Sequence, residues 1–484
     1  MTVTASYPEL RSWDRLMIGG RWVDPAGAET IDSIAAGTGE VVARVPAASA
    51  ADVDAAVAVA RKAFDEGPWP RLAPAERAAA LGRVRDEIAA RLDEMIAAFS
   101  VEIGAPAAVS SAFHDNALKM WDDNVRLLGE LAFEEEREVA GEGIVRIVSE
   151  PVGVVGTIIP WNGPVATASL KLAPALAAGC TVVLKPAPEG PVSMMLMAEA
   201  LAAADLPEGV VSVLPAGREV GEHLVRHPDV DKVAFTGSTA AGRRIMSLCG
   251  ERIARVTLEL GGKSAGIIAD DVPLDDVLPS LVFAGIGHTG QVCAALTRIL
   301  VPRERQDEVV AAVASFLEGL EVGDPFAAGT VLGPLAAERQ LERVEGYVAA
   351  GVAEGARLVT GGHRIEGPGW YFEPTLFADV DPSMRIAEEE IFGPVLVIIP
   401  FDGPDDAVRI ANDSIYGLSG AVYARDPSLA ESIARRIRTG QISINTWGMC
   451  VTQPSGGFKQ SGLGREGGPE GIRAYLEPKL IAGL

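Results

Sequence analysis

Short apolar runs between residues 152 and 260 constrain the fold of this chain more than any other feature. They read VGVVGTII, TVVLK, VVSVL, KVAFTG and RVTLEL, and valine and isoleucine dominate them. Runs without polar alternation are typical of strands buried on both faces, as in a parallel sheet covered by helices. Helical patterns at residues 191–204 and 219–226 separate several of the runs. We therefore predict an α/β fold with a doubly wound, Rossmann-like domain.

The carboxyl ends of these strands are the expected ligand sites, because doubly wound sheets bind ligands there. In this sequence the ends fall near Pro160, Lys185, Gly217, Gly237 and Gly261. Ser238 opens a helix whose first N–H groups could face an anion, although the serine could equally act only as an N-cap. Lys185 places a cation where a ribose or phosphate would lie, although a solvated lysine is the simpler interpretation.

The rest of the chain adds a helical N-terminal third and a second α/β region. Apolar residues recur at helical spacing from Val53 to Phe64, with Asp52 as the candidate N-cap. Further strands are expected near Ile299 and at residues 394–401 and 440–445. A length of 484 residues fits two or three domains.

A polar stretch, EEEREVAGEGIVRIVSE at residues 134–150, interrupts the first domain. The alternation of Ile144, Arg146 and Val148 suits an exposed hairpin. Because exposed strand edges pair readily with other chains, we expect this hairpin to be an oligomerisation arm.

Composition excludes several classes of function. A formal net charge of −24 argues against binding to nucleic acid or to an anionic membrane surface. The uncharged runs at residues 151–170 and 277–297 approach spanning length, but prolines and polar residues interrupt them, so we predict buried segments and no membrane span. The N-terminus has no leader pattern, and we expect a cytoplasmic location. The four cysteines form no C-x-x-C pair, which predicts neither a metal site nor disulfides.

The stretch AGIGHTGQVCAAL, residues 284–296, admits two interpretations. GIGHTG matches the G-x-G-x-x-G dinucleotide fingerprint, with residues 281–284 as the required strand and 291–298 as the helix. Alternatively, Cys293 is a nucleophile, although most buried cysteines are inert core residues. A second match, GLGREG at residues 462–467, has no strand before it.

Glu259 lies among leucines and glycines in LELGGKSAG, where desolvation would raise its pKa toward that of a useful general base. A buried ion pair is the alternative. The GKS segment is not a P-loop, because Thr257 occupies the position of the required first glycine.

Six motifs taken together resemble the aldehyde dehydrogenase superfamily over essentially the whole chain. They are PWNGP, FTGST, LELGGKS, TGQVCAAL, EEIFGP and PSGGFKQSG, in the family's order and spacing. Cys293 follows Glu259 by 34 positions (293 − 259), which fits the same family. The resemblance implies that Cys293 is the nucleophile and that the glycines of GIGHTG only shape its loop.

The resemblance also implies a mechanism. Cys293 attacks an aldehyde, the Asn162 amide and the Cys293 N–H hold the oxyanion, and the thiohemiacetal gives up hydride to a nicotinamide to leave a thioester. A water activated by Glu259 then releases the acid, and Lys171 belongs to a proton path. The presence of Glu259 favours hydrolysis over acyl transfer to coenzyme A.

Cofactor residues carried over by resemblance are Glu390 and Phe392 for the nicotinamide riboside, Lys185 for the adenosine ribose and Ser238 for the pyrophosphate. The remaining expected cofactor contacts are Ile158, Trp161, Gly217, Gly221, Phe235, Leu260 and Gln340. NAD is the preferred cofactor. NADP stays open because Pro188 replaces the glutamate that many members have three residues after the lysine, and Glu189 stands one place later.

The expected organisation is a cofactor-binding domain at residues 1–130 and 150–259 and a catalytic domain at 260–467. Residues 131–149 and 468–484 would form the oligomerisation arm of a homodimer or homotetramer.

Two departures from the family pattern concern the substrate. Gly163 and Ser455 stand where many members have aromatic residues, so we predict a widened tunnel and a preference for aromatic, terpenoid or long-chain aldehydes. Cys450 either lines that site or packs, Cys180 and Cys249 are expected to be structural, and His288 is interpreted as a loop residue without a catalytic role.

Two alternatives remain at this stage. One is a coenzyme A-acylating or semialdehyde-specific dehydrogenase, and the other is a catalytically silent binding protein on the same fold. Retention of Cys293, Glu259 and Asn162 together argues against the silent protein.

Overall fold

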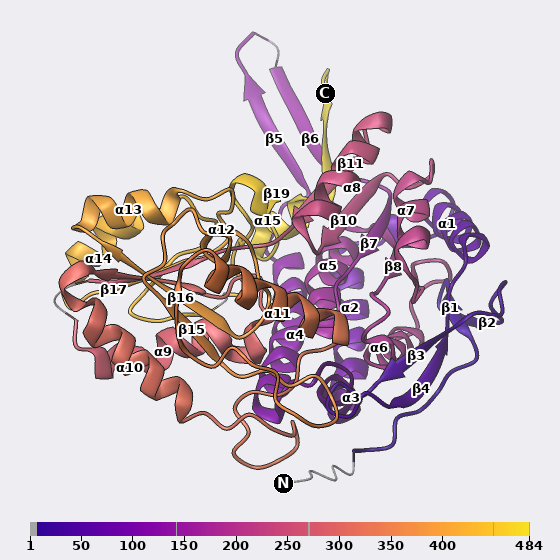
Figure 1. Ribbon diagram of the computed structural model, residues 1–484. Helices are drawn as coiled ribbons and strands as arrows, with labels where there is room; N and C mark the ends of the chain where they lie inside the picture. The colour runs from indigo at the N-terminus through magenta and orange to yellow at the C-terminus, as the bar shows by residue number, and fades with distance from the viewer. Residues whose placement is uncertain (1–6, 142, 270–271, 449, 484) are drawn as a thin grey trace.

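The structure is a computed structural model that describes residues 7–141, 143–269, 272–448 and 450–483. Residues 1–6, 142, 270–271, 449 and 484, which the expected domains and arm include, lie outside the described residues. Figure 1 shows two sheet-containing bodies side by side, with a three-stranded arm projecting from one of them.

The first sheet contains the predicted parallel strands. They are β7 (Val154–Ile158), β8 (Thr181–Lys185), β9 (Val211–Val213), β10 (Lys232–Thr236) and β11 (Arg255–Glu259). Their spatial order is β11-β10-β7-β8-β9, so the chain moves outward from β7 to β9 and then returns to the other side of β7. The strand order therefore reverses between β7 and β10, and the crevice at such a reversal is where doubly wound sheets bind ligands.

Short antiparallel strands close both edges of this sheet. β1 (Leu16–Ile18) and β2 (Arg21–Val23) lie beyond β9, and β19 (Gly462–Leu463) pairs with β11. The strand β19 comes from the segment expected to belong to the catalytic domain, so the chain returns to the first sheet before its end. A separate hairpin joins β3 (Thr30–Ile34) to β4 (Val41–Pro46).

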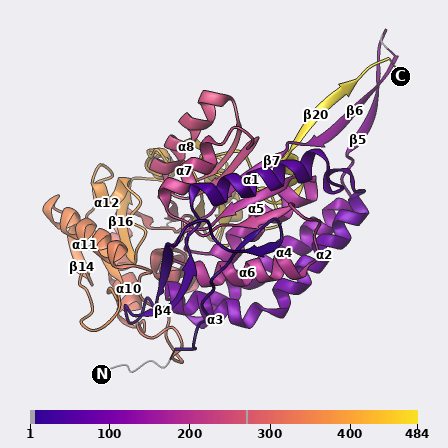
Figure 2. The same cartoon turned by 90° about the vertical axis from the view of Figure 1, so that its right-hand side faces the viewer.

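Helices cover both faces of the first sheet (Figure 2). Val154 and Ile158 of β7 pack into a core with α1 (Ala50–Asp65), α7 (Arg218–Arg226) and α8 (Thr239–Arg252). Val155 faces the other core, which is formed with α2 (Pro74–Ala90), α3 (Leu92–Ile103), α4 (Ala107–Leu128), α5 (Pro164–Ala178) and α6 (Pro191–Ala203). Burial on both faces explains why these strands show no polar alternation.

The expected N-cap of α1 is wrong by three residues. Ser49 is the N-cap, and its hydroxyl accepts a hydrogen bond from the Asp52 N–H. The Asp52 carboxylate in turn accepts a hydrogen bond from the Ser49 N–H at 2.8 Å, which completes a capping box.

The second sheet has the order β14-β15-β16-β13-β12-β17-β18 and is parallel except at β14. Its strands are β12 (Ala265–Ile268), β13 (Arg298–Pro302), β14 (Arg357–Thr360), β15 (Thr375–Ala378), β16 (Val395–Phe401), β17 (Gly420–Tyr423) and β18 (Ser443–Ile444). Helices α9 (Leu274–Ile286) and α10 (Gln306–Glu318) cover one face, and α11 (Glu338–Ala353), α12 (Arg385–Glu388), α13 (Pro404–Asn412) and α14 (Pro427–Ala434) cover the other. The strand expected at residues 440–445 is reduced to the two residues of β18.

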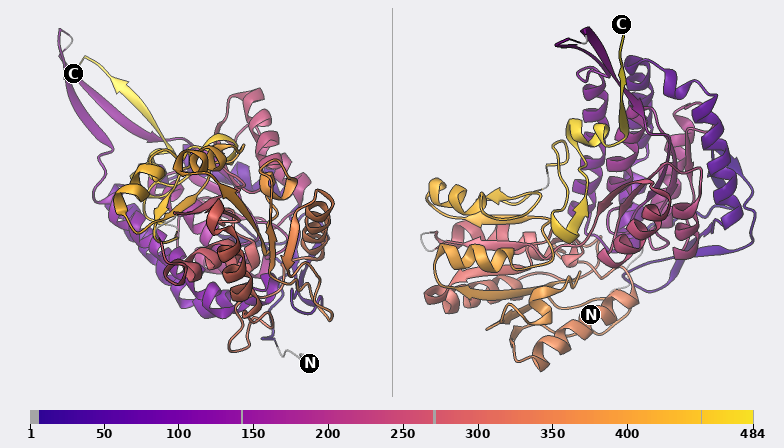
Figure 3. Two further views of the ribbon diagram at one scale, coloured as in Figure 1. Left: turned by 60° about the vertical axis from the view of Figure 1, so that its left-hand side comes forward. Right: turned by 90° about the horizontal axis from the view of Figure 1, so that it is seen from above.

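The arm is a sheet of β5 (Glu134–Val139), β6 (Gly143–Pro151) and β20 (Leu476–Ile481), and it projects from the body (Figure 3). Residues 468–475 do not join this sheet, although they were expected in the arm. Helix α15 (Gly468–Arg473) contacts α4 and α5, and Ile472 and Tyr475 are buried in the first core. Ile144 and Leu480 of the arm are 48% and 61% exposed.

Within the described ranges, every helix is too short or too polar to cross a membrane. The same ranges contain no group of three or more His, Cys, Asp or Glu residues arranged to hold a metal ion.

Candidate active site

The loop that carries Cys293 connects α9 to β13. Residues 281–284 lie inside α9, and residues 291–297 form no helix and contain only a turn at 293–294. The strand and helix required by the dinucleotide fingerprint are therefore both absent from this described segment. The glycines instead shape the loop: Gly290 has φ +70°, and a Cβ there would collide with the carbonyl of Gly393. The structure therefore excludes the phosphate-cradle interpretation of GIGHTG.

The environment of Cys293 holds its thiol in the protonated form. Burial, together with the carboxylates of Glu390 and Glu259, which repel a thiolate, raises the pKa of Cys293 to about 12. Backbone N–H groups of Cys293 and Ala294 oppose this effect but do not outweigh it. An approaching positive charge, or the loss of charge from one of these carboxylates, would lower this pKa and favour the thiolate.

Asn162 approaches the same loop from the first sheet. It lies in the turn between β7 and α5, at the reversal of strand order, and its Nδ2 donates a hydrogen bond to the Gln291 carbonyl at 2.8 Å. An amide nitrogen has two N–H groups, so one remains to bind a further acceptor. Asn162 and Cys293, which are 131 positions apart (293 − 162), thus belong to one site.

Glu259 ends β11, where the chain leaves the first sheet for β12 of the second. Its Oε1 is shielded from water and has no hydrogen-bond partner among the described residues. Burial raises the pKa of Glu259 to about 8, and the negative charge of Glu466 adds to the shift. A carboxylate with an unfilled acceptor and a pKa near neutrality is suited to general-base chemistry.

The buried ion pair considered for Glu259 exists, but it joins Lys171 to Glu466. Lys171 Nζ donates to Glu466 Oε1 at 2.5 Å, and the two side chains are 0% and 3% exposed. The cation of Lys171 also acts on Glu259 and opposes the rise in its pKa. Lys171 therefore lies beside Glu259 through its partner Glu466, for which local sequence gave no sign, and its expected place in a proton path stays a prediction.

The only sequence signal for Glu466 was its place in the segment GLGREG, which was considered solely as a fingerprint match. In the structure Ser455 and Glu466 form an antiparallel bridge, with backbone hydrogen bonds of 2.8 and 2.9 Å. That bridge, together with β19, brings residues 455–466 against Glu259. Gly456 lies so close to Glu259 that a Cβ there would be 2.9 Å from Oε1.

The predicted nicotinamide residues form a cluster between the two domains. Glu390 Oε1 accepts the Gly262 N–H at 3.1 Å, and burial raises the pKa of Glu390 to about 7. The rings of Trp161 and Phe392 meet edge to face with centroids 5.5 Å apart. Phe392 has φ +63°, an uncommon conformation that Gln340 supports by donating to the Phe392 carbonyl at 2.7 Å.

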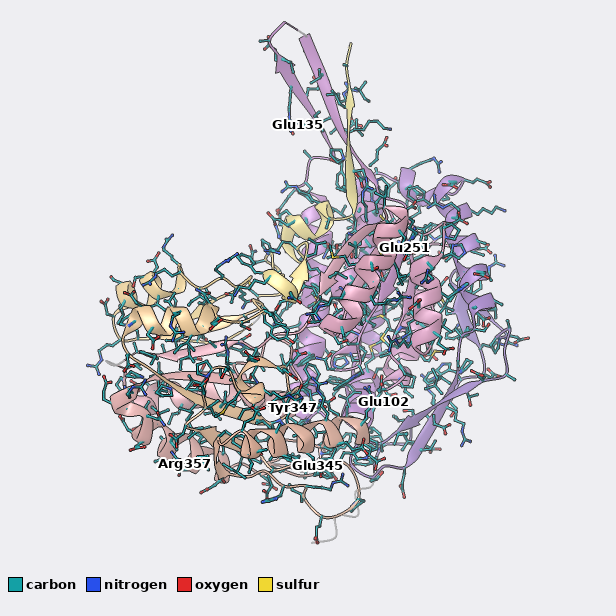
Figure 4. The ribbon with its side chains drawn as sticks, turned by 45° about the horizontal axis from the view of Figure 1, so that its top comes forward. Glu102, Glu135, Glu251, Glu345, Tyr347 and Arg357 are labelled. Atoms are coloured by element: carbon teal, nitrogen blue, oxygen red, sulfur yellow. The ribbon has the colours of Figure 1, made fainter. Side chains whose placement is uncertain are left out.

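Helix α11 holds this cluster in place from the second domain. Arg343 Nε donates to the Ile391 carbonyl at 2.9 Å, and Tyr347 donates to Glu389 at 2.7 Å. Figure 4 labels Tyr347 on α11, and its ring is buried in the core that α11 and α12 form on the second sheet. Gln340 thus contacts the loop of Glu390 and Phe392, and its expected cofactor contact stays a prediction.

The predicted adenosine-ribose residues meet at the ends of β7 and β8. A Cβ on Gly221 would lie 3.5 Å from Lys185 and 3.9 Å from Ile158. Lys185 is only 6% exposed, and burial lowers its pKa to about 8, so the interpretation as a solvated lysine is wrong. Glu189 lies close enough to oppose this shift, but its carboxylate is paired with Arg339 from the second domain.

A buried carboxylate fixes the loop that carries Pro188 and Glu189. Glu102 accepts hydrogen bonds from the Val192 and Ser193 N–H groups at 2.7 and 3.0 Å and from two serine hydroxyls, at the start of α6. Figure 4 labels Glu102 inside the first domain. Local sequence gives no signal for Glu102, because its partners lie 69 to 91 positions away along the chain.

The remaining expected cofactor residues divide into exposed and buried positions. Gly217 is exposed at the N-cap of α7, with open space where a Cβ would be. Ser238 is exposed and does cap α8 by accepting the Ala241 N–H at 3.3 Å. Phe235 and Leu260 are both 6% exposed and belong to the hydrophobic core, so their expected cofactor contacts stay predictions.

The space beside Gly163 is filled by an aromatic ring from α4. A Cβ on Gly163 would be 2.8 Å from the Phe113 ring, which also contacts Phe99 and His288. The absence of an aromatic at residue 163 therefore does not by itself leave a vacancy. Cys180 and Cys249 are buried as expected of structural residues, and Cys450 is exposed.

Comparisons with known proteins match the whole chain. The model of the aldehyde dehydrogenase family matches residues 22–481. Geranial dehydrogenase from Castellaniella defragrans is 44% identical over 471 residues, which cover 96% of this chain and 98% of that protein. A Mycobacterium tuberculosis aldehyde dehydrogenase complexed with NAD+ has a TM-score of 0.96 at 46% identity and covers 98% and 99% of the two chains. A mutant aldehyde dehydrogenase C from Pseudomonas syringae, complexed with NAD+ and octanal, has a TM-score of 0.93 at 42% identity and covers 97% and 96%.

Proposed function

This chain belongs to the aldehyde dehydrogenase family, and on that premise we propose that it oxidises an aldehyde to the free carboxylic acid through a covalent intermediate on Cys293. The observation that carries the proposal is the convergence of a cysteine, an amide donor and a carboxyl group. Asn162 is bonded to the loop of Cys293, and the charge of Glu259 acts on the Cys293 thiol.

In the first half of the reaction the Cys293 thiol gives its proton to the ionised carboxylate of Glu259, which passes it on before the second half. The sulfur bonds to the aldehyde carbon, and the carbonyl π electrons move to oxygen. The free N–H of Asn162 and the Cys293 N–H stabilise that oxyanion, and each such donor contributes about 3 kcal/mol in comparable sites. Bound NAD+ would supply the hydride acceptor, and loss of the hydride from the aldehyde carbon would convert the thiohemiacetal on Cys293 into a thioester.

In the second half Glu259 takes a proton from water as the water oxygen attacks the thioester carbon. The carbon–sulfur bond breaks, Cys293 is regenerated and the acid is released, so one aldehyde, one water and one NAD+ give one acid, one NADH and one proton. The Lys171–Glu466 pair lies beside Glu259 and provides groups that can pass this proton onward. A carboxyl group in this position supports hydrolysis over transfer to coenzyme A.

The residues present suit NAD+. The open space at Gly217, the exposed start of α8 at Ser238 and the buried amine of Lys185 line the ends of neighbouring strands where a dinucleotide would lie. Glu390 and the Trp161–Phe392 pair would hold the nicotinamide riboside between the domains. Because Glu189 is paired with Arg339, Lys185 is left to bind the ribose hydroxyls. Lys185 and Arg339 are two cations near the expected position of a 2′-phosphate, so we propose NADP as a secondary cofactor.

The proposed substrates are terpenoid and long-chain aldehydes. The similarity to a geranial dehydrogenase and to a structure that contains octanal supports this class. Ser455 contributes a small side chain to the segment against Glu259, whereas Phe113 replaces the ring missing at Gly163. We therefore attribute room for a bulky chain to Ser455 and not to Gly163.

Absorbance of NADH provides the direct test. Geranial, octanal, benzaldehyde and acetaldehyde are supplied to the wild type and to Cys293→Ala, with and without coenzyme A. We expect coenzyme A-independent turnover that is lost in Cys293→Ala and a kcat/KM that is lowest for acetaldehyde. Turnover only with coenzyme A, or turnover that survives in the variant, would contradict the proposed mechanism.

We also propose that the arm assembles this chain into a homodimer or homotetramer. The arm presents the unpaired outer edges of β5 and β20 and the exposed apolar side chains of Ile144 and Leu480. Such edges are suited to pairing with a second chain.

A further inference from the structure

His288 is a buried polar side chain in the Cys293 loop to which the proposed mechanism gives no task. The residue is 2% exposed, and its ring lies between Phe99 and Phe113 with both centroid distances at 5.4 Å. Its Nε2 is 3.0 Å from the backbone carbonyl oxygen of Asn162. Because a carbonyl oxygen only accepts hydrogen bonds, this Nε2 must carry the proton and donate it.

The hydrogen bond from His288 is one half of a reciprocal pair. The His288 side chain holds the main chain of Asn162, and the Asn162 side chain holds the main chain of Gln291 at 2.8 Å. Gln291 is tied in turn to the His288 carbonyl through its N–H at 3.1 Å. The two segments are therefore linked in both directions, two residues before Cys293.

The backbone at this point is unusual. His288 and Thr289 both adopt left-handed conformations, with φ of 56° and 55°. This conformation is unfavourable for residues other than glycine and persists only where surrounding contacts maintain it, most often at functional sites. Thr289 is anchored by donating to the Gly333 carbonyl at 2.9 Å, and His288 is anchored by Asn162 and the two phenylalanine rings.

We propose that His288 is a positioning residue that sets the amide of Asn162 against Cys293. It fixes the main chain of Asn162, while the bond from Asn162 to Gln291 fixes the rotation of the amide. The second N–H of that amide is then directed at the place where the oxyanion develops. This inference rests on the proposed function, in which Asn162 stabilises the oxyanion.

The ring performs this task without a charge. Burial lowers the pKa of His288 to about 4, so the imidazole is neutral at physiological pH and its Nε2–H is available as a donor. A side chain that keeps a donor at the same reach should substitute for it, whereas an aromatic ring without a donor should not.

The test compares His288→Phe, which keeps a ring and loses the donor, with His288→Gln, which keeps a donor and loses the ring. For His288→Phe we expect kcat to fall about 100-fold, as for a catalytic group displaced by about 1 Å. The KM for NAD+ and NAD+ binding followed by protein fluorescence should stay within about twofold, since His288 has no described contact with the nucleotide residues. His288→Gln should recover most of kcat.

His114→Phe is the matched control. His114 is also buried and packs against Phe99 at 5.8 Å, but its ring is bonded to the Ser110 carbonyl and not to Asn162. It should keep kcat even if it lowers Tm. Equal losses of kcat in both phenylalanine variants would overturn the inference, because they would indicate a general packing effect.

A double-variant comparison separates the inference from the proposed function. Asn162→Ala alone should lower kcat about 100-fold or more, and adding His288→Phe should cause little further loss, because both residues act through the same donor. A further full loss in the double variant would overturn the role of His288. If Asn162→Ala kept kcat, the proposed oxyanion role itself would fail and the inference with it.

Discussion

Glu466 accepts a hydrogen bond from Lys171 at 2.5 Å inside the protein, and its negative charge adds to the effect of burial in raising the pKa of Glu259 at the end of β11. Glu259 ends β11 and Glu466 follows β19, the strand that pairs with β11. The proposed base therefore depends for its pKa on a residue 207 positions later in the chain (466 − 259).

The first prediction concerns the pH dependence of thioester hydrolysis. With its pKa raised to about 8, Glu259 is protonated at lower pH and becomes a base as the pH rises through that value. We expect kcat to increase between about pH 7 and 9. Glu466→Gln removes the like charge, which lowers the pKa of Glu259 and shifts the rising limb to lower pH.

Glu470→Gln serves as the control for that experiment, because Glu470 is an exposed glutamate four positions away. It should leave the pH profile of kcat in place. If the rising limb of the pH profile of kcat stayed at the same pH in Glu466→Gln, the electrostatic coupling between Glu466 and Glu259 would be refuted.

The second prediction concerns the reactivity of Cys293 in the free enzyme. Because burial and the Glu390 carboxylate raise its pKa, the thiol should react slowly with iodoacetamide at pH 7.5. Glu390→Gln should speed alkylation about tenfold, the factor expected for a pKa that falls by roughly one unit. Glu388→Gln, at an exposed glutamate nearby, should not change the rate; equal rates in all three proteins would contradict the electrostatic account.

The third prediction uses the contact between Gly163 and Phe113. Gly163→Phe should lower kcat/KM about 100-fold or more, since its Cβ would be 2.8 Å from the Phe113 ring. Adding Phe113→Ala should restore most of the activity, because the two rings then exchange places. Phe113→Ala alone should raise kcat/KM for geranial relative to acetaldehyde. Failure of the double variant to recover would show that the two positions do not share one space.

The fourth prediction concerns the choice of cofactor. Glu189→Gln frees Arg339 from its partner, and a guanidinium is well suited to bind a 2′-phosphate. We expect the KM for NADP to fall several-fold while the KM for NAD changes by less than about twofold. Glu338→Gln is the control beside Arg339, and an unchanged NADP-to-NAD ratio in Glu189→Gln would exclude Arg339 as a phosphate contact.

The fifth prediction tests the arm. Ile144→Asp combined with Leu480→Asp places charges on its exposed apolar side chains and should reduce the assembly, measured by light scattering, toward the 50.5 kDa of one chain. Val41→Asp, at a similarly exposed valine on β4, should leave the mass unchanged. A double variant with the wild-type mass would place the interface elsewhere.

Several features followed from local sequence alone, because their physical causes are local. Strands buried on both faces are largely apolar, so β7, β8 and β10 could be located from their composition. Their carboxyl ends then identified Lys185 and Gly237 as candidate ligand positions. The family motifs added Cys293, Asn162 and Glu259, and the structure brings these three into one site.

Two expectations about local structure, a helix N-cap and a short strand, differ from the structure. Asp52 was predicted as an N-cap, although it occupies the third position of a capping box whose N-cap is Ser49. Residues 281–284, which the fingerprint interpretation of GIGHTG required as a strand, lie in α9. A short apolar run has the same composition in a buried strand and in a buried helix.

Contacts between distant segments were decided only by the tertiary structure. Lys171 and Glu466 are 295 positions apart, and a lysine or glutamate in isolation is most often solvated, so their sequence gave no sign of a buried pair. Phe113 fills the space beside Gly163, and His288 reaches Asn162 from a different domain. The sequence determined which residues are apolar, flexible or reactive. Packing determined which of them form ion pairs, van der Waals contacts or hydrogen bonds with one another, because these contacts depend on a proximity in space that local patterns do not encode.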